Sequence, residues 1–84
     1  MTITIVREES HGFLFAAAND EAAKRALIDT DWVNKGSTID TSGDGDWECL
    51  EDIYGDKWKE AFLSFNREQL SDMGFYLKTA EVWE

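Results

Sequence analysis

The sequence predicts a single α+β domain in which an antiparallel sheet of three to four strands packs with two to three helices. Three observations support this prediction. Segments with the two-residue period of strands lie near both ends of the chain, over residues 2–6 and 75–83. Segments with helical spacing of apolar residues lie between them, over residues 20–29 and 58–65. The 84 residues, 1–84, suffice for one hydrophobic core only, and they include no proline and no linker-like stretch.

The first part of the chain is typical of a β-hairpin. Residues 2–6 alternate polar and β-branched side chains, so we expect a half-buried strand with Ile3 and Ile5 facing the core. Gly12 permits a turn, and residues 13–17 follow as a second strand. Because the two strands are adjacent in sequence and joined by a short turn, we expect them to pair.

A helix is predicted after the hairpin, beginning behind Asn19 and ending near Asp29. Asn19 is a favourable N-cap residue, because its side chain can accept a hydrogen bond from the first turn. Acidic residues occupy that first turn and basic residues follow, which is the order that the helix dipole favours. The apolar face of this helix is small and consists of Ala22, Ala23, Ala26 and Leu27.

The middle of the chain is less regular, because it is rich in glycine, serine and threonine. A strand is predicted around residues 37–41. Trp47, Leu50 and Ile53 are spaced three apart and fit the start of a helix, whereas Trp47 and Cys49 would alternate on a strand. Both alternatives remain open on the sequence alone.

A second amphipathic helix is predicted after Asp56, which we expect to be its N-cap. Its apolar face is the expected main ridge of the core and consists of Trp58, Ala61, Phe62 and Phe65. Asn66 and Gln69 have capping-box spacing and predict a short helix that Gly74 ends. Residues 75–83 then alternate as a final strand.

Most aromatic side chains of so small a domain are expected in the core. The alternative is an exposed aromatic patch beside the acidic residues, formed by Tyr76, Val82 and Trp83. Such a patch with an acidic rim would resemble a protein-binding surface, because tryptophan and tyrosine dominate the energetics of interfaces.

The charge of the chain is strongly acidic and unevenly distributed. Eighteen acidic residues face eight basic ones, a formal net charge of −10, and residues 40–56 contain seven carboxylates with no lysine or arginine. A cluster of this density repels nucleic acid and anionic membranes and attracts a basic protein surface or a divalent cation. No segment has the length and apolarity of a membrane span, and the N-terminus lacks the basic region of a signal peptide, so we expect a cytoplasmic protein.

Candidate catalytic residues are few, and we expect a protein that is not an enzyme. His11 is the only histidine and lies in the expected hairpin turn beside Ser10, an arrangement that favours a solvent-exposed side chain. Cys49 is the only cysteine, which excludes an internal disulfide and a zinc site with two thiolates. Its acidic neighbours disfavour the thiolate form, so we expect a small core residue. Glycine-rich phosphate-binding motifs are absent from the sequence.

Residues 40–51 resemble an EF-hand calcium loop, with a glycine at the position of the sharp turn, Gly45. The resemblance implies Ca²⁺ as an alternative ligand, bound by Asp40, Ser42, Asp44, Asp46, Glu48 and Glu51. Residues 34–38 depart from the family because they are a poor incoming helix, and no second loop follows. An acidic turn between two elements is the competing interpretation.

The favoured hypothesis needs no cofactor and treats the cluster as a contact surface for a basic protein. The residues assigned to this surface are Asp44, Asp46, Glu48, Glu51, Asp52 and Asp56. In size, acidity and lack of catalytic residues and disulfides, the chain resembles phage-encoded anti-CRISPR proteins and DNA mimics. The resemblance is one of profile and implies inhibition of a basic nucleic-acid-binding protein, such as a CRISPR effector or nuclease, in the host cytoplasm.

This hypothesis includes a monomer or a homodimer and no direct contact with nucleic acid or membrane. Two further interpretations remain open: an adaptor whose acidic residues contact a basic partner unrelated to nucleic acid, and a small phage structural protein that assembles through its aromatic residues.

Overall fold

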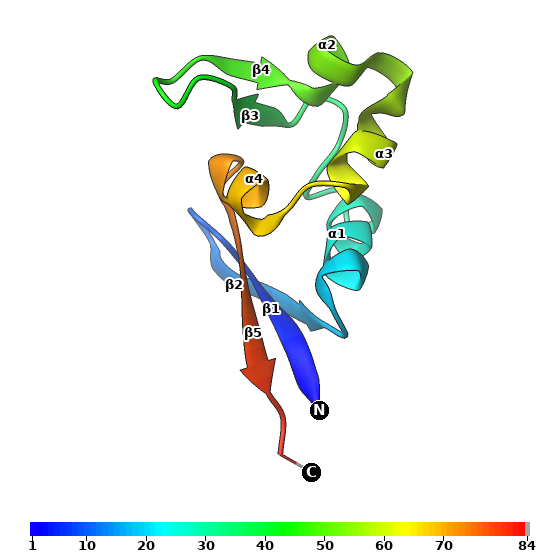
Figure 1. Cartoon of the computed structure of the whole chain (residues 1–84), viewed down its shortest axis with the longest axis vertical. Helices are drawn as coiled ribbons and strands as arrows, with labels where there is room; N and C mark the ends of the chain where they lie inside the picture. The colour runs from blue at the N-terminus through cyan, green and yellow to red at the C-terminus, as the bar shows by residue number, and fades with distance from the viewer. Residues whose placement is uncertain (84) are drawn as a thin grey trace.

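Two antiparallel sheets, one of three strands and one of two, are joined by short helices in the computed structural model, which describes residues 1–83 (Figure 1). The elements in chain order are β1 (Thr2–Glu8), β2 (Gly12–Ala17), α1 (Asp20–Asp29), β3 (Thr38–Asp40), β4 (Trp47–Cys49), α2 (Leu50–Tyr54), the 3-10 turn η1 (Gly55–Lys57), α3 (Trp58–Leu63), α4 (Arg67–Asp72) and β5 (Phe75–Glu81). The predicted α+β class is confirmed. The molecule is elongated, with extents of 44 × 26 × 19 Å.

The three-stranded sheet has the order β2-β1-β5, with β1 in the centre. The predicted hairpin of the first two strands is therefore confirmed. Val6 pairs with Phe15 on one side and with Leu77 on the other, which places three apolar side chains in one row. A β-bulge follows Val6, where the register with β2 shifts by one residue.

The prediction that Ile3 and Ile5 face the core is wrong. Thr4 and Val6 are buried, whereas Ile3 and Ile5 are half-buried on the opposite face of the sheet. Thr4 tolerates burial because its hydroxyl donates a hydrogen bond of 2.8 Å to Asp20 Oδ1. An alternating pattern defines the two faces of a strand but does not show which face the helices cover. In β1 the helices cover the face that carries Val6, which is fully buried.

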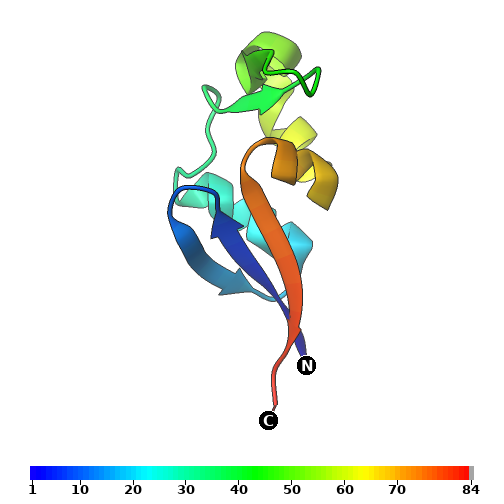
Figure 2. The same ribbon diagram turned by 90° about the vertical axis from the view of Figure 1, so that its left-hand side faces the viewer.

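The helices lie on one side of the three-stranded sheet. In Figure 2 the strands β1 and β2 lie in front of α1, and α4 lies between this sheet and the β3–β4 hairpin. The buried side chains of the core come from both sheets and from every α-helix, and they are Val6, Ala23, Leu27, Val33, Ile39, Leu50, Phe62, Phe65, Leu70 and Phe75. Ile39 and Leu50 thus attach the β3–β4 hairpin and α2 to the rest of the molecule.

Both alternatives left open for the middle segment occur, one after the other. Residues 47–49 form strand β4, paired with β3, and the helix α2 begins directly afterwards at Leu50. The strand predicted around residues 37–41 is confirmed as β3, over Thr38–Asp40.

N-caps are predicted correctly at two of three positions. The Asn19 side chain accepts a hydrogen bond from the Ala22 N–H at 2.8 Å, and Asn66 and Gln69 form the predicted capping box before α4. Gly74 follows α4 with φ of 91°, a conformation that favours glycine.

Asp56 is not the N-cap of the second amphipathic helix, contrary to prediction. It lies inside the 3-10 turn η1, and the Trp58 N–H donates to the Gly55 carbonyl of that turn. Because a preceding helical turn supplies this acceptor, α3 begins without a side-chain cap. α3 also ends at Leu63, so Phe65 belongs to the core but not to the helix.

Candidate functional site

The predicted contact surface lies at one end of the elongated molecule, which we call the acidic end and define as residues 40–56 (Figure 1). The six predicted side chains occupy the hairpin turn, β4, α2 and η1, in the order Asp44, Asp46, Glu48, Glu51, Asp52 and Asp56. All six residues are exposed. The fold therefore gathers them at one end and keeps them in solvent.

Positive charge does not neutralise this surface in the part of the chain that the structure describes. Among the six residues of this surface, Glu51 alone forms an ion pair there, and its carboxylate lies 3.7 Å from Lys35 Nζ. That pair is exposed on both sides, so it contributes little to stability. The other five carboxylates have no ion-pair partner within residues 1–83.

The Asp40 carboxylate holds the turn of the hairpin. Its carboxylate accepts hydrogen bonds from the backbone N–H groups of Ser42, Gly43 and Gly45, at 3.3, 3.0 and 3.1 Å. Gly43 and Gly45 have φ of 79° and 95°, which only glycine adopts readily. We call residues 41–46 the hairpin tip. Both carboxylate oxygens of Asp40 thus accept hydrogen bonds from the backbone of this tip.

The ligands of the calcium-loop alternative are not brought together. The flanks of residues 40–51 are strands that pair with each other, not the incoming and outgoing helices of an EF-hand. Glu51 lies beyond β4 in α2, where its backbone N–H donates to the Lys35 carbonyl. Within residues 1–83 no group of three or more histidine, cysteine, aspartate or glutamate side chains is placed to hold a metal ion.

Exposed aromatic side chains accompany the acidic end, but they are not the predicted ones. Trp47 is 52% exposed and Tyr54 is 37% exposed. Tyr76, Val82 and Trp83 are also exposed, but on and beyond β5 in the other half of the molecule, where the Val82 N–H donates to the Met1 carbonyl. The expectation that these three side chains lie in the core is therefore wrong, and the alternative patch beside the acidic residues is not formed by them either. Sequence reasoning missed Trp47 because it could not choose between strand and helix there.

His11 has a structural partner in the hairpin between β1 and β2. Its Nδ1 lies 2.6 Å from Glu8 Oε2, and its ring packs edge-on against Trp32. The contact with His11 lowers the pKa of the Glu8 carboxyl, and the backbone N–H groups of His11 and Ser10 act in the same direction. The contacts with Glu8 and Trp32 thus give the His11 side chain a structural role in the turn.

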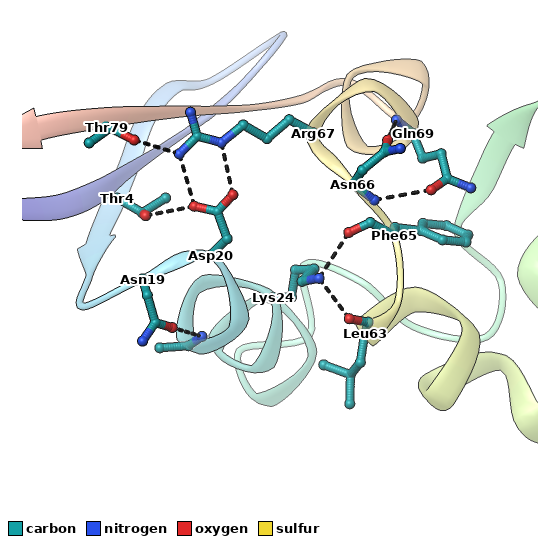
Figure 3. Close-up of polar contacts among 11 residues, drawn as sticks. Thr4, Asn19, Asp20, Lys24, Leu63, Phe65, Asn66, Arg67, Gln69 and Thr79 are labelled. Carbon is teal, nitrogen blue, oxygen red and sulfur yellow. Dashed lines mark hydrogen bonds and ion pairs between the residues drawn. The ribbon is translucent and has the colours of Figure 1, made fainter.

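Two long-range polar contacts fix the other half of the molecule (Figure 3). The Arg67 guanidinium donates to both oxygens of Asp20, at 2.8 and 2.9 Å, and to Thr79 Oγ1 at 2.7 Å. This joins α1, α4 and β5 and lowers the pKa of Asp20, mainly through the Arg67 hydrogen bonds. Lys24 is buried in α1 and donates to the carbonyls of Leu63 and Phe65, at 2.6 and 2.8 Å.

No protein-family model, curated protein or solved structure matches the chain. The longest α-helix in residues 1–83, α1, has ten residues, and none of the described helices is long and apolar enough to cross a membrane.

Proposed function

We propose that the acidic end binds a basic protein surface of the kind that holds nucleic acid, and that binding there excludes the nucleic acid. The contact residues in this proposal are Asp44, Asp46, Glu48, Glu51, Asp52 and Asp56. The observation that supports it most is the concentration of exposed carboxylates on one projecting end, with Glu51 alone paired to a base in residues 1–83.

Electrostatics favours this use of the surface. Exposed like charges repel one another and weaken the compact state, so a cluster without compensating bases has a cost that a bound cationic surface removes. At physiological salt the potential extends about 8 Å, which is far enough to steer a basic partner toward the acidic end and to repel nucleic acid.

The spacing of the carboxylates suits a surface that binds phosphates. Asp46 immediately precedes β4 and Glu48 lies within it, and positions two apart in an extended chain are separated by roughly 6.6 Å. Successive phosphates of one DNA strand rise by about 3.4 Å along the helix axis, so this separation is close to the axial rise of two nucleotides. Trp47 lies between the two carboxylates in sequence and supplies an exposed aromatic anchor of the kind that dominates interfaces.

The class of partner that we favour is a nucleic-acid-binding enzyme such as a CRISPR effector or nuclease. Such enzymes hold their substrate in a positively charged channel. A protein with an acidic, projecting end needs no catalytic chemistry to compete with DNA for that channel.

The test is a competition assay with two variants of equal charge. In the first, the six contact residues become their amides. The control removes six exposed carboxylates that lie outside the acidic end: Glu9, Asp29, Asp31, Glu60, Asp72 and Glu81. Binding of labelled duplex DNA to purified Cas9-type effectors and nucleases is followed by fluorescence anisotropy with increasing amounts of each protein.

We expect the unmodified protein and the control to displace DNA from at least one enzyme. We expect the contact variant to need at least about tenfold more protein, because buried charge contacts typically contribute more than 1.4 kcal/mol in total. The association rate should also fall steeply as salt rises toward about 0.5 M. Equal displacement by the two variants, or no displacement from any enzyme, would contradict the proposal.

A further inference from the structure

One face of the three-stranded sheet is left uncovered by the helices. Cross-strand pairing places Arg7 between Phe13 and Tyr76, Ile5 between Ala16 and Lys78, and Ile3 beside Ala80. Paired residues point to the same side of a sheet, and Ile3 and Ile5 point away from the core. We call this surface the open face; its members are Ile3, Ile5, Arg7, Phe13, Ala16, Tyr76, Lys78 and Ala80. In Figure 2 the strands lie in front of α1, with this side toward the viewer.

The open face has the opposite charge to the rest of the protein. Arg7 and Lys78 are its two charged members, and both are basic in a chain of net charge −10. Neither forms an ion pair within residues 1–83, although acidic residues are abundant. The two bases therefore have no ion-pair partner in residues 1–83, although Glu8 and Glu9 lie beside Arg7 at one end of the face.

Aromatic side chains surround these bases. Phe13 is 63% exposed and Tyr76 is 45% exposed, on either side of Arg7. A shallow hollow of about 350 Å³ lies there, lined by Arg7, Glu8, Glu9, Gly12 and Tyr76. The Glu8 carboxylate on its rim is held by His11 and by the backbone of Ser10 and His11. Exposed aromatic rings beside unpaired bases are typical of a protein-binding surface.

The complementary surface is present on the same chain. The hairpin tip carries Asp44 and Asp46, whose carboxylates make no hydrogen bond or ion pair in the described residues, and Trp47 follows directly. In Figure 1 the hairpin tip projects to the left, and Figure 2, seen from that side, shows the open face in front. The acidic tip and the basic face thus lie on one side of the molecule, at different heights along its 44 Å axis.

We propose that two copies of this chain form an antiparallel dimer in which each hairpin tip rests on the open face of the other. A two-fold axis along the viewing direction of Figure 1 inverts one copy and brings each tip to the height of the other copy's sheet. Asp44 and Asp46 meet Arg7 and Lys78, and Trp47 packs beside Phe13 and Tyr76. The two contacts are identical, so the assembly closes as a dimer.

Dimensions agree with this arrangement. Neighbouring strands lie about 4.8 Å apart, so a two-stranded tip is narrower than the roughly 10 Å spanned by three strands. The contact is small and charged, and we expect micromolar or weaker affinity that falls with salt. This inference does not depend on an outside partner. It adds one consequence to the proposed function, namely that a basic partner has to displace the second copy from the tip.

The test measures molar mass by sedimentation velocity from about 10 µM to about 1 mM, a range in which small interfaces dissociate. We expect a reversible monomer–dimer equilibrium that shifts to monomer as salt rises to about 0.5 M. Arg7→Glu/Lys78→Glu and, separately, Asp44→Lys/Asp46→Lys should each weaken dimerisation at least about tenfold, because each makes tip and face alike in charge. Lys57→Glu/Lys59→Glu is the matched control, with the same charge change outside the open face, and should dimerise within about threefold of the parent.

Mixing the two reversed variants gives the decisive measurement. The tip of Asp44→Lys/Asp46→Lys then meets the acidic face of Arg7→Glu/Lys78→Glu, while the other contact keeps its native charges. We therefore expect the mixture to form a heterodimer more tightly than either variant associates with itself. Circular dichroism and thermal unfolding establish that each variant is folded.

Three outcomes overturn the proposal: a monomer at every concentration, a dimer insensitive to Asp44→Lys/Asp46→Lys, or a mixture of folded variants that stays monomeric. The second outcome would indicate that two open faces pack on each other. If Arg7→Glu/Lys78→Glu does not fold, Asp44→Lys/Asp46→Lys still tests the dimer. Its two substitutions lie in an exposed turn that the Asp40 carboxylate holds, so we expect this variant to fold.

Discussion

The two halves of this molecule use charge in opposite ways. In the half built from β1, β2, β5, α1 and α4, ionisable side chains hold elements together: Asp20 and Arg67 join α1 to α4, and Lys24 donates to one carbonyl at the end of α3 and one just after it. In the acidic end Asp40 binds the backbone of the hairpin tip, but the other six carboxylates are exposed to solvent, and Glu51 alone contacts a base in the described chain. The difference separates charges that stabilise the fold from charges that are available to a partner.

Packing follows the same division. The residues 41–48 are all exposed, and the acidic end is attached through a few buried side chains such as Ile39 and Leu50. The other half contributes five of the ten buried apolar side chains of the core, including Val6, Leu27 and Leu70, whereas residues 40–56 contribute Leu50. Substitutions in the hairpin tip should therefore change binding without unfolding the protein, whereas single polar substitutions in the other half should change stability.

The largest expected effect comes from Lys24→Ala. This substitution leaves the carbonyls of Leu63 and Phe65 without their donor in a buried position. Because an unsatisfied buried group retains its desolvation penalty, we expect a loss of about 2–3 kcal/mol in the free energy of unfolding, measured by urea denaturation.

The matched base in the acidic end is Lys35, whose contact with Glu51 is long and exposed. Lys35→Ala should cost less than about 0.5 kcal/mol. Equal losses of unfolding free energy in Lys24→Ala and Lys35→Ala would show that charged side chains stabilise both halves to the same extent. Lys24→Met, which keeps most of the apolar stem, should fall between the two alanine variants.

A smaller effect with a defined pH dependence is expected for Asp20→Asn. Arg67 lowers the pKa of Asp20 in the folded state, so the ionised carboxylate stabilises the fold above the ordinary carboxyl pKa of about 3.9. Asp20 and Arg67 are 39% and 43% exposed, so water screens the pair, and we expect a loss of about 1 kcal/mol at pH 7.

That loss should shrink as pH falls below about 4 and through the lowered pKa, because the native Asp20 then becomes protonated as well. Urea denaturation of both proteins at pH 7 and near pH 3 measures the change. A difference between the two proteins that is constant with pH would show that shape rather than charge determines the role of Asp20.

The sequence predicted local features of both halves and missed what joins them. Asn19 and Asn66 were predictable as caps because a cap depends on residues three positions away. The Asp20–Arg67 contact spans 47 residues, and no short pattern encodes it. The inward face of β1 was assigned wrongly because the buried Thr4 depends on that same contact network.

The acidic end shows the same limit. The charge density of residues 40–56 correctly predicted exposed carboxylates, because burying so many unpaired charges is too costly. The spacing of glycine and aspartate fitted a calcium loop and a hairpin turn equally well. The two patterns differ in the elements that flank the loop, which are paired strands here, and that pairing of β3 with β4 is not visible in residues 40–51 alone.

The smallest effect, opposite in sign, is expected for Asp44→Asn/Asp46→Asn. Neither carboxylate makes a hydrogen bond or ion pair within residues 1–83, so their removal relieves repulsion from the other carboxylates of the acidic end. We expect Tm to rise by about 1–3 °C in low salt, measured by differential scanning calorimetry at a protein concentration low enough to keep the chain monomeric. The gain should vanish in about 0.5 M salt, because screening removes the repulsion from the parent protein as well. Glu60→Gln/Glu81→Gln removes the same charge outside the acidic end and should leave Tm nearly unchanged. A fall in Tm for the tip variant would mean that these carboxylates stabilise the fold, and the two halves would then not differ in how they use charge.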